Sequence, residues 1–157
     1  MKRLSTRIVV AGALFLLLLY TAQAGQQDDN GKPADGKPGT AFIGTWKLVS
    51  AKYGGVESDL AQQLTMFKHI TDTHFTWVRV EPQTGEVVAA AGGTYSVEGD
   101  TYSETPAYGM GAPFQVIRDK THAFKVTIEG TRWHHTGALA DGLTIEEVWE
   151  RVEPKQQ

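Results

Sequence analysis

Short runs of alternating apolar and polar residues follow one another along the chain from residue 45 to residue 153. Successive side chains of a β-strand point to opposite faces, so this alternation predicts strands that bury one face. The runs recur every ~8–12 residues between turn residues, which is typical of an antiparallel sandwich or barrel. We expect strands at 45–52, 65–71, 74–81, 86–91, 93–98, 101–106, 114–118, 122–129, 131–136 and 143–153.

The connections between these runs indicate the order of the strands. Short links that contain glycine join several neighbouring runs, at 82–85, 98–100, 129–131 and 140–142. Links of this kind form hairpins, so strands that follow one another in sequence should also pair with one another. Eight to ten short strands in this order predict an all-β domain, an antiparallel up-and-down β-barrel.

Two segments depart from the strand pattern. Residues 57–64 carry Leu60 and Leu64 on one side, and Ser58 can cap a helix there. We therefore expect one short helix between the first two strands, lying across one end of the barrel. Residues 107–113 (AYGMGAP) combine glycine with proline, which favours a mobile loop at the rim of the barrel mouth.

Alternation also indicates which side chains face the interior. Aromatic residues with a few polar groups are typical of a small binding pocket, and the candidate ligand-binding residues are Tyr95, Tyr102, Glu104, Trp133, His135, Glu147 and Trp149. The same set also suits a filled core in which polar groups find internal partners. In 74–81 the pattern is ambiguous, because either Phe75, Trp77 and Arg79 or Val78 and Val80 can face inward.

The first 24 residues have the form of a signal peptide. Three basic residues precede the apolar run 8–20, and Ala22-Gln23-Ala24 follows as a small-x-small cleavage site. The run is shorter than the ~20 residues that span a bilayer core, so we expect cleavage after Ala24 in preference to a retained anchor. The protein is therefore expected to be exported, to the periplasm or the extracellular space.

The next segment, residues 25–41, has the composition of a flexible linker. It is rich in Gly, Pro, Asp and Lys and carries almost no apolar side chain. One domain then remains, over residues 42–154. Because the chain has no cysteine, this domain must be stable through apolar burial without disulfides.

The charge pattern limits the partners that the domain could have. Signal cleavage removes three basic residues and no acid, which changes the formal net charge from −3 to −6. The remaining Lys and Arg residues are scattered singly, whereas nucleic-acid binding needs a concentrated basic face. We expect no nucleic-acid partner and, after cleavage, no stable membrane span; the sequence carries no signal for an oligomeric state.

Motifs for metal binding or nucleophilic catalysis are not evident. His134 and His135 are adjacent in a predicted strand and should point to opposite faces, and no compact pair of metal-ligating histidines occurs. The chain also has no Gly-x-Ser-x-Gly elbow and no phosphate-binding glycine loop before a helix. We therefore expect neither a metal nor a cofactor.

The two ends of the domain carry a recognisable pair of motifs. Gly44-Thr45-Trp46 opens the first predicted strand, and Arg151 lies in the last one, within IEEVWERVEP (145–154). With DTHFTWV (72–78) and GGTYSVEGDTYSET (92–105), this pattern resembles small bacterial exported lipocalin-like domains of the calycin superfamily, over residues 42–154. The resemblance implies that Arg151 lies across the ring of Trp46, so that Gly44, Trp46 and Arg151 form a structural floor of the barrel.

Three functions are compatible with these observations. The first is a non-enzymatic exported barrel that binds a small, largely apolar ligand in its interior. The second is an enzyme in the same barrel that uses acid–base chemistry at Glu104, His135 or Glu147. The third is an envelope interaction module with a filled core. A cavity beneath residues 107–113 would favour the first two over the third.

Overall fold

The computed structural model describes residues 39–153. The predicted signal peptide, residues 25–38 of the predicted linker and Pro154 lie outside the described residues. The elements in chain order are η1 (Thr40–Phe42), β1 (Gly44–Tyr53), β2 (Val56–Ser58), α1 (Leu60–Gln63), β3 (Thr65–Ile70), β4 (His74–Val80), β5 (Val87–Glu98), β6 (Thr101–Met110), α2 (Ala112–Ile117), β7 (His122–Glu129), β8 (Arg132–Ala138) and β9 (Thr144–Arg151).

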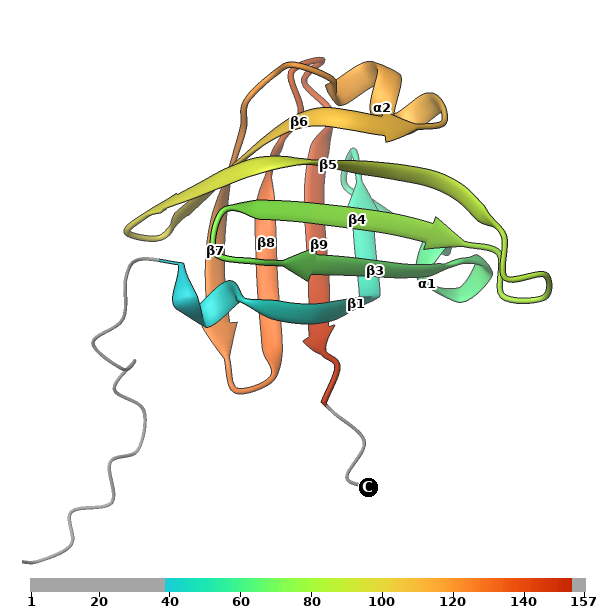
Figure 1. The fold of residues 1–157 in the computed structure, drawn as a ribbon, viewed down its shortest axis with the longest axis horizontal. Helices are drawn as coiled ribbons and strands as arrows, with labels where there is room; N and C mark the ends of the chain where they lie inside the picture. Colours follow the sequence, from blue (N-terminus) through green and yellow to red (C-terminus); the bar gives the residue numbers. More distant parts are fainter. Residues whose placement is uncertain (1–38, 154–157) are drawn as a thin grey trace, which may run out of the picture. The chain divides into compact units, whose positions relative to one another are not determined.

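The strands form one antiparallel sheet that closes on itself. Their order is β2-β1-β3-β4-β5-β6-β7-β8-β9, and β1 pairs in addition with β9. Strand β2 pairs with the end of β1, so the closed ring consists of eight strands. Figure 1 shows β3, β4 and β5 running across the direction of β7, β8 and β9 behind them. The predicted antiparallel up-and-down barrel is thus confirmed.

The predicted helix between the first two long strands is also present, although it is shorter than expected. Residues 56–58 pair with β1 as β2, and helix α1 begins only at Leu60. The N-cap of α1 is Asp59 and not Ser58 as predicted, although the hydroxyl of Ser58 does accept a hydrogen bond of 3.2 Å from the amide of Leu60. Helix α1 lies at one end of the barrel, where Leu60 packs against the core.

Two strand predictions were wrong. The two predicted runs at 86–91 and 93–98 belong to a single strand, β5, which spans Val87–Glu98. Gly92 and Gly93 are buried in it, and the pairing with β6 shifts there without ending the strand. Residues 114–118 are not a strand, since 112–117 form helix α2. Gly111, with φ at +83°, ends β6, and Pro113 occupies the first turn of the helix, a position that proline favours.

The segment 107–113 is accordingly more ordered in its secondary structure than a rim loop. Residues 107–110 extend β6, and α2 follows after Gly111. The short apolar run that suggested a strand over 114–118 has a helical spacing, because Phe114 and Ile117 are buried while Val116 between them is exposed.

Trp46 and Arg151 meet at the seam where β1 and β9 close the barrel. They are directly opposite in the register, and the guanidinium carbon of Arg151 lies 4.1 Å from the centroid of the Trp46 ring. Arg151 also donates hydrogen bonds to the carbonyls of Ile43 (2.7 Å) and Ala41 (2.6 Å). The cation therefore joins both strand ends and the short helix η1.

Gly44 is required by this arrangement. Its φ is +135°, and a Cβ atom there would lie 2.7 Å from Nη1 of Arg151. Any larger residue would both strain the backbone and displace the guanidinium group.

Aromatic rings fill the barrel behind the seam. Trp133 has its ring centroid 5.0 Å from those of Phe42 and Tyr102 and 5.5 Å from that of Trp46. These side chains are buried, and the indole nitrogen of Trp46 donates to the carbonyl of Phe42 at 2.7 Å. This end of the barrel is consequently a packed core.

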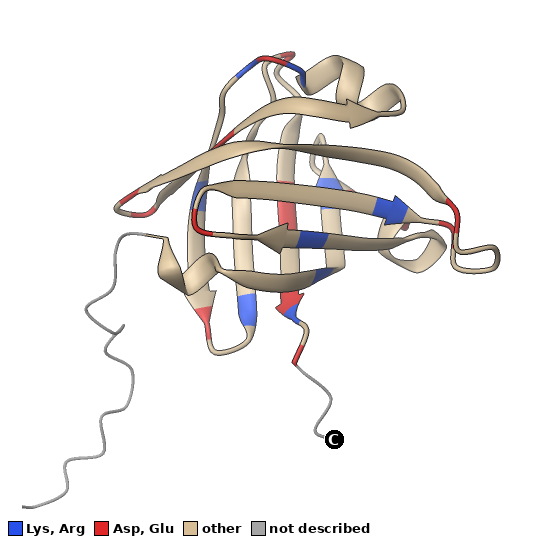
Figure 2. Ribbon diagram, in the orientation of Figure 1, with Lys and Arg blue, Asp and Glu red and all other residues tan. Residues whose placement is uncertain are grey.

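Charged residues of the described domain are spread over many strands and turns (Figure 2). Figure 2 marks basic positions singly along the strands, often with acidic positions nearby, which is not the concentrated basic face that a nucleic acid requires. Neither α-helix within residues 39–153 has the length and apolarity of a membrane span.

A thermodynamic cycle tests the contribution of the seam. Trp46→Ala removes a fully buried ring and should lower the free energy of unfolding by about 3–5 kcal/mol. Arg151→Ala should cost less, and the two losses should not add, because each substitution removes the other residue's partner. Urea unfolding of the four proteins measures this coupling. The exposed Arg132, replaced by alanine, is the control, and strict additivity of Trp46 and Arg151 would contradict the proposed contact.

Candidate functional site

The other end of the barrel is hollow. A cavity of about 480 Å³ lies there, and it is reached between α1, α2 and the β8–β9 connection, which together form the mouth. The mouth residues are Ser58, Asp59, Leu60, Gln63, Pro113, Val116, Leu139, Asp141 and Leu143. The interior is lined by Tyr53, Met66, Lys68, Trp77, Arg79, Glu104, Pro106, Ile117, His122, Phe124, His135, Ile145, Glu147 and Trp149.

The most buried ion pair of the described residues joins Lys68 of β3 to Glu104 of β6. The ammonium nitrogen lies 2.7 Å from Oε1 of Glu104, and both residues are buried. Lys68 also lies over aromatic rings, 4.8 Å from the centroid of Trp149 and 5.0 Å from that of Trp133. A carboxylate and aromatic faces thus surround a cation that would be very costly to bury alone.

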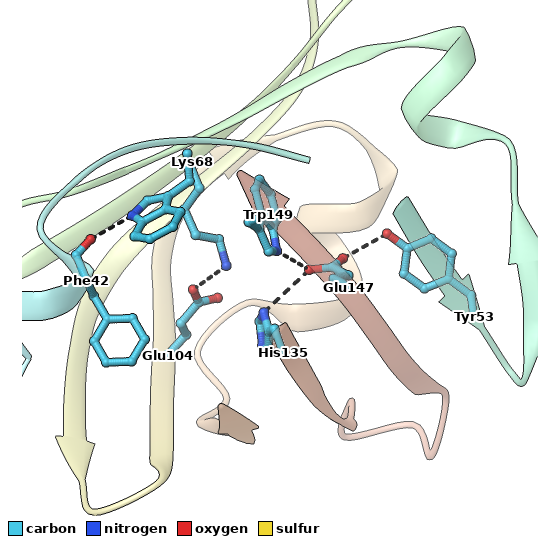
Figure 3. A network of polar contacts seen from close by, with 8 residues as sticks. Phe42, Tyr53, Lys68, Glu104, His135, Glu147 and Trp149 are labelled. Atoms are coloured by element: carbon cyan, nitrogen blue, oxygen red, sulfur yellow. Dashed lines mark hydrogen bonds and ion pairs between the residues drawn. The ribbon is translucent and has the colours of Figure 1, made fainter. Parts of the chain in front are cut away.

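A second polar group centres on Glu147 of β9 (Figure 3). One carboxylate oxygen accepts a hydrogen bond of 2.9 Å from the hydroxyl of Tyr53, and the other accepts one of 3.0 Å from the indole nitrogen of Trp149. Each oxygen of this buried carboxylate therefore has a donor from the wall of the cavity.

His135 of β8 lies beside Glu147, directly opposite it in the strand register. Burial, together with the nearby positive charge of Lys68, holds the pKa of His135 well below its ordinary value of 6.5. Its Nδ1 lies 3.5 Å from Oε2 of Glu147, which is too long for a good hydrogen bond. The contact is consequently one between a neutral imidazole and a carboxylate, and not an ion pair.

Tyr53 and Arg79 complete the polar part of the wall. Burial, followed by the negative charge of Glu147, raises the pKa of Tyr53, so its hydroxyl remains a donor; the positive charge of Arg79 opposes that shift. The guanidinium of Arg79 lies 5.4 Å from the centroid of Trp77, and its Nε has no hydrogen-bond partner among the residues described.

Four of the seven candidate residues from the sequence line the cavity: Glu104, His135, Glu147 and Trp149. Tyr102 and Trp133 do not line it; they lie in the packed core, near Lys68. Tyr95 is half-buried, stacks on Tyr102 at 5.3 Å and donates its hydroxyl to the carbonyl of Thr71. Alternation alone could assign a face to each residue but not a depth along the barrel.

Sequence reasoning missed four polar residues of the wall: Tyr53, Lys68, Arg79 and His122. Met66, Lys68 and Ile70 do share a face, but Phe67 on the other face obscured the pattern. Arg79 belonged to the strand whose inward face was ambiguous, and the structure places Phe75 and Trp77 inward beside it. His122 is held by its Nε2, 3.1 Å from the carbonyl of Ile117 in α2, a helix that was expected to be a strand.

The arrangement suits enclosure of a molecule better than metal coordination. Within residues 39–153, no three side chains of His, Cys, Asp or Glu converge as the ligands of a metal ion would. Apolar walls surround a small number of fixed polar groups, as in many small-molecule sites.

Comparison with known proteins supports the fold assignment. The chain is similar to an uncharacterized protein from Bacteroides eggerthii, with a TM-score of 0.50 and 15% identity over 71% of this chain and 99% of that one. A lipocalin-like protein from Bacteroides uniformis gives a TM-score of 0.49 and 14% identity, over 70% and 97% of the two chains. No protein-family model and no curated protein matches the sequence. At these identities the likeness concerns the fold alone, an antiparallel β-barrel.

The buried ion pair leads to a prediction about stability. Lys68→Met leaves Glu104 buried without its cation and should lower the free energy of unfolding by about 3–5 kcal/mol. The double variant Lys68→Met/Glu104→Gln should recover much of that loss, because no uncompensated charge remains. Chemical unfolding measures both. The exposed pair Lys125 and Asp100 is the control, and its removal should change the unfolding midpoint little.

The environment of His135 predicts a dependence of stability on pH. Below pH 6.5 the imidazole of the unfolded chain takes up a proton while the folded one stays neutral, so the unfolded state binds more protons. The free energy of unfolding should therefore fall as the pH drops below this value, by up to about 1.4 kcal/mol per pH unit.

Urea unfolding at a series of pH values checks this slope. His135→Phe should make the slope shallower, whereas His134→Phe, on the opposite face of the same strand, should leave it unchanged. An identical slope in the His135 variant would show that other groups cause the pH dependence.

Proposed function

We propose that this chain is an exported, non-enzymatic barrel that binds a small, largely apolar molecule in its interior. The observation that carries the proposal is the cavity of about 480 Å³, which has apolar walls and a mouth at one end of the barrel. A volume of this order is in the range of ligand pockets for small molecules. A domain that works through its outer surface alone would have no need of such a hollow interior.

The polar groups of the wall favour binding over acid–base catalysis. His135 and Glu147 are close enough to suggest a catalytic pair, which is the specific support for the alternative. However, both oxygens of Glu147 already accept hydrogen bonds, and Glu104 is paired with Lys68. Each carboxylate thus already has partners in the wall, and no hydrogen bond joins His135 to Glu147 as it would join the members of a catalytic acid–base pair.

Export is part of the proposal and rests on the N-terminal sequence. A cleavable signal peptide should leave a mature chain that begins at Gly25. N-terminal sequencing of the protein from the periplasmic or extracellular fraction measures this. An intact Met1 in a membrane fraction would show that the segment is an anchor.

Narrowing the mouth tests binding in the cavity. Val116 and Leu143 line the mouth from two elements and are exposed, so Val116→Trp/Leu143→Trp should fold normally while obstructing entry. The uncharged dye N-phenyl-1-naphthylamine is a suitable apolar probe. The affinity of the double variant for this dye should be about tenfold or more weaker than that of the wild type, a loss of at least ~1.4 kcal/mol in binding free energy.

Val152→Trp is the matched control, because Val152 is as exposed as Val116 (both 43%) but is not among the cavity residues. Its affinity for the dye should equal that of the wild type. If all three proteins bind the dye equally, the dye binds elsewhere and the proposal loses its support. Native mass spectrometry of the mature protein would then search for molecules that copurify with it.

A further inference from the structure

The hydrogen-bonding capacity of His135 is unused. Its side chain lines the cavity and is only 2% exposed, yet neither ring nitrogen has a hydrogen-bond partner among residues 39–153. A polar group buried in this way costs free energy unless a partner is supplied. Nδ1 faces Oε2 of Glu147 at 3.5 Å without forming a hydrogen bond, and the side chain lines the cavity, so a molecule in the cavity can supply a partner.

The ring cannot easily turn away to find another partner. It is stacked on Trp133, with centroids 5.5 Å apart and planes 13° from parallel, and the edge contact with Phe124 is 3.9 Å between centroids. Both contacts fix the plane of the imidazole. The ring nitrogens therefore lie in a fixed plane at the cavity wall, as the polar group of a binding site should.

The charged groups beside His135 already have partners. Lys68 is paired with Glu104, and the two oxygens of Glu147 accept from Tyr53 and Trp149. Arg79 also lines the cavity and forms no ion pair with a carboxylate within residues 39–153, but its charge acts on the Tyr53 hydroxyl and not on His135. A charged ligand group beside His135 would lose its hydration on entering the cavity. No free counter-ion beside His135 would offset that cost.

We propose that the ligand carries an uncharged hydroxyl group at its inner end, and that this hydroxyl bonds to His135. This inference rests on the proposed binding function. A neutral imidazole has one donor and one acceptor nitrogen, and a hydroxyl can serve either one because it both donates and accepts. A carboxylate only accepts and an ammonium group only donates, and each brings a charge. Apolar side chains such as Met66, Trp77, Phe124 and Ile145 then surround the body of the alcohol.

Three probes of equal chain length test the inference: 1-decanol, decanoate and decylammonium, titrated at neutral pH by calorimetry. The wild type should bind 1-decanol about tenfold or more tightly than either ion. His135→Phe should weaken 1-decanol binding about tenfold, which corresponds to the loss of one buried hydrogen bond. It should leave the affinities for the two ions nearly unchanged. His134→Phe is the control and should behave as the wild type.

The outcomes separate the inference from the proposed function. If decanoate or decylammonium binds most tightly, or if His135→Phe leaves 1-decanol binding unchanged, the hydroxyl inference is overturned while binding in the cavity stands. If the three probes and the naphthylamine dye all fail to bind, the hydroxyl inference and the proposed binding function are both overturned.

A measurement on the wild-type protein tests the hydrogen bond even if the variant misfolds. In protein labelled with ¹⁵N-histidine, 1-decanol should shift the ring nitrogen resonances of His135 and leave those of the exposed His69 in place. Unchanged His135 resonances in the complex would refute the hydrogen bond, whatever the variant does.

Discussion

The pairing of β1 with β9 gives the domain its inside. It turns a sheet into a closed barrel, so that none of the eight strands of the ring is left without a neighbour, and it separates an interior from an exterior. The floor residues lie at this seam. Arg151 covers Trp46 and holds the carbonyls of residues 41 and 43, so the same cation fastens the first and last strands together.

Closure divides the interior into two parts with different roles. Near the seam, Phe42, Trp46, Tyr102 and Trp133 fill the barrel by edge and tilted ring contacts. Toward the mouth the side chains leave a cavity. The filled part can provide the apolar burial that a domain without disulfides needs, and the hollow part is thereby available for a ligand.

The polar residues lie where these two parts meet. Lys68 contacts the aromatic core on one side and Glu104 on the other, and His135 stacks on Trp133 while it lines the cavity. Because the rings of the core are rigidly packed, the polar groups above them are held in fixed directions. A ligand would meet a prearranged set of hydrogen-bonding groups, with no need for the barrel to reorganise.

Local signals in the sequence specify the class of fold. Alternation with a period of two, short glycine-bearing links and the motifs around Trp46 and Arg151 are local signals, and they were enough to predict an up-and-down barrel and most of its strands. The same alternation assigned Glu104, His135, Glu147 and Trp149 to the inner face. Local patterns failed where a short apolar run fits either a strand or a helix. Residues 114–118 form such a run, but Pro113 and the spacing of Phe114 and Ile117 agree with helix α2.

Which inward residues line a cavity and which are packed beneath it follows from contacts between distant parts of the chain. Depth along the barrel depends on strand register and on contacts between strands far apart in sequence. Lys68 reaches Glu104 from β3 to β6, and Tyr53 reaches Glu147 from the other end of the chain. No local pattern encodes such distances, so Tyr53, Lys68 and Arg79 gave no clear signal, and Tyr102 and Trp133 looked like cavity residues. The alternation of a strand specifies a face, whereas a site requires a position in three dimensions.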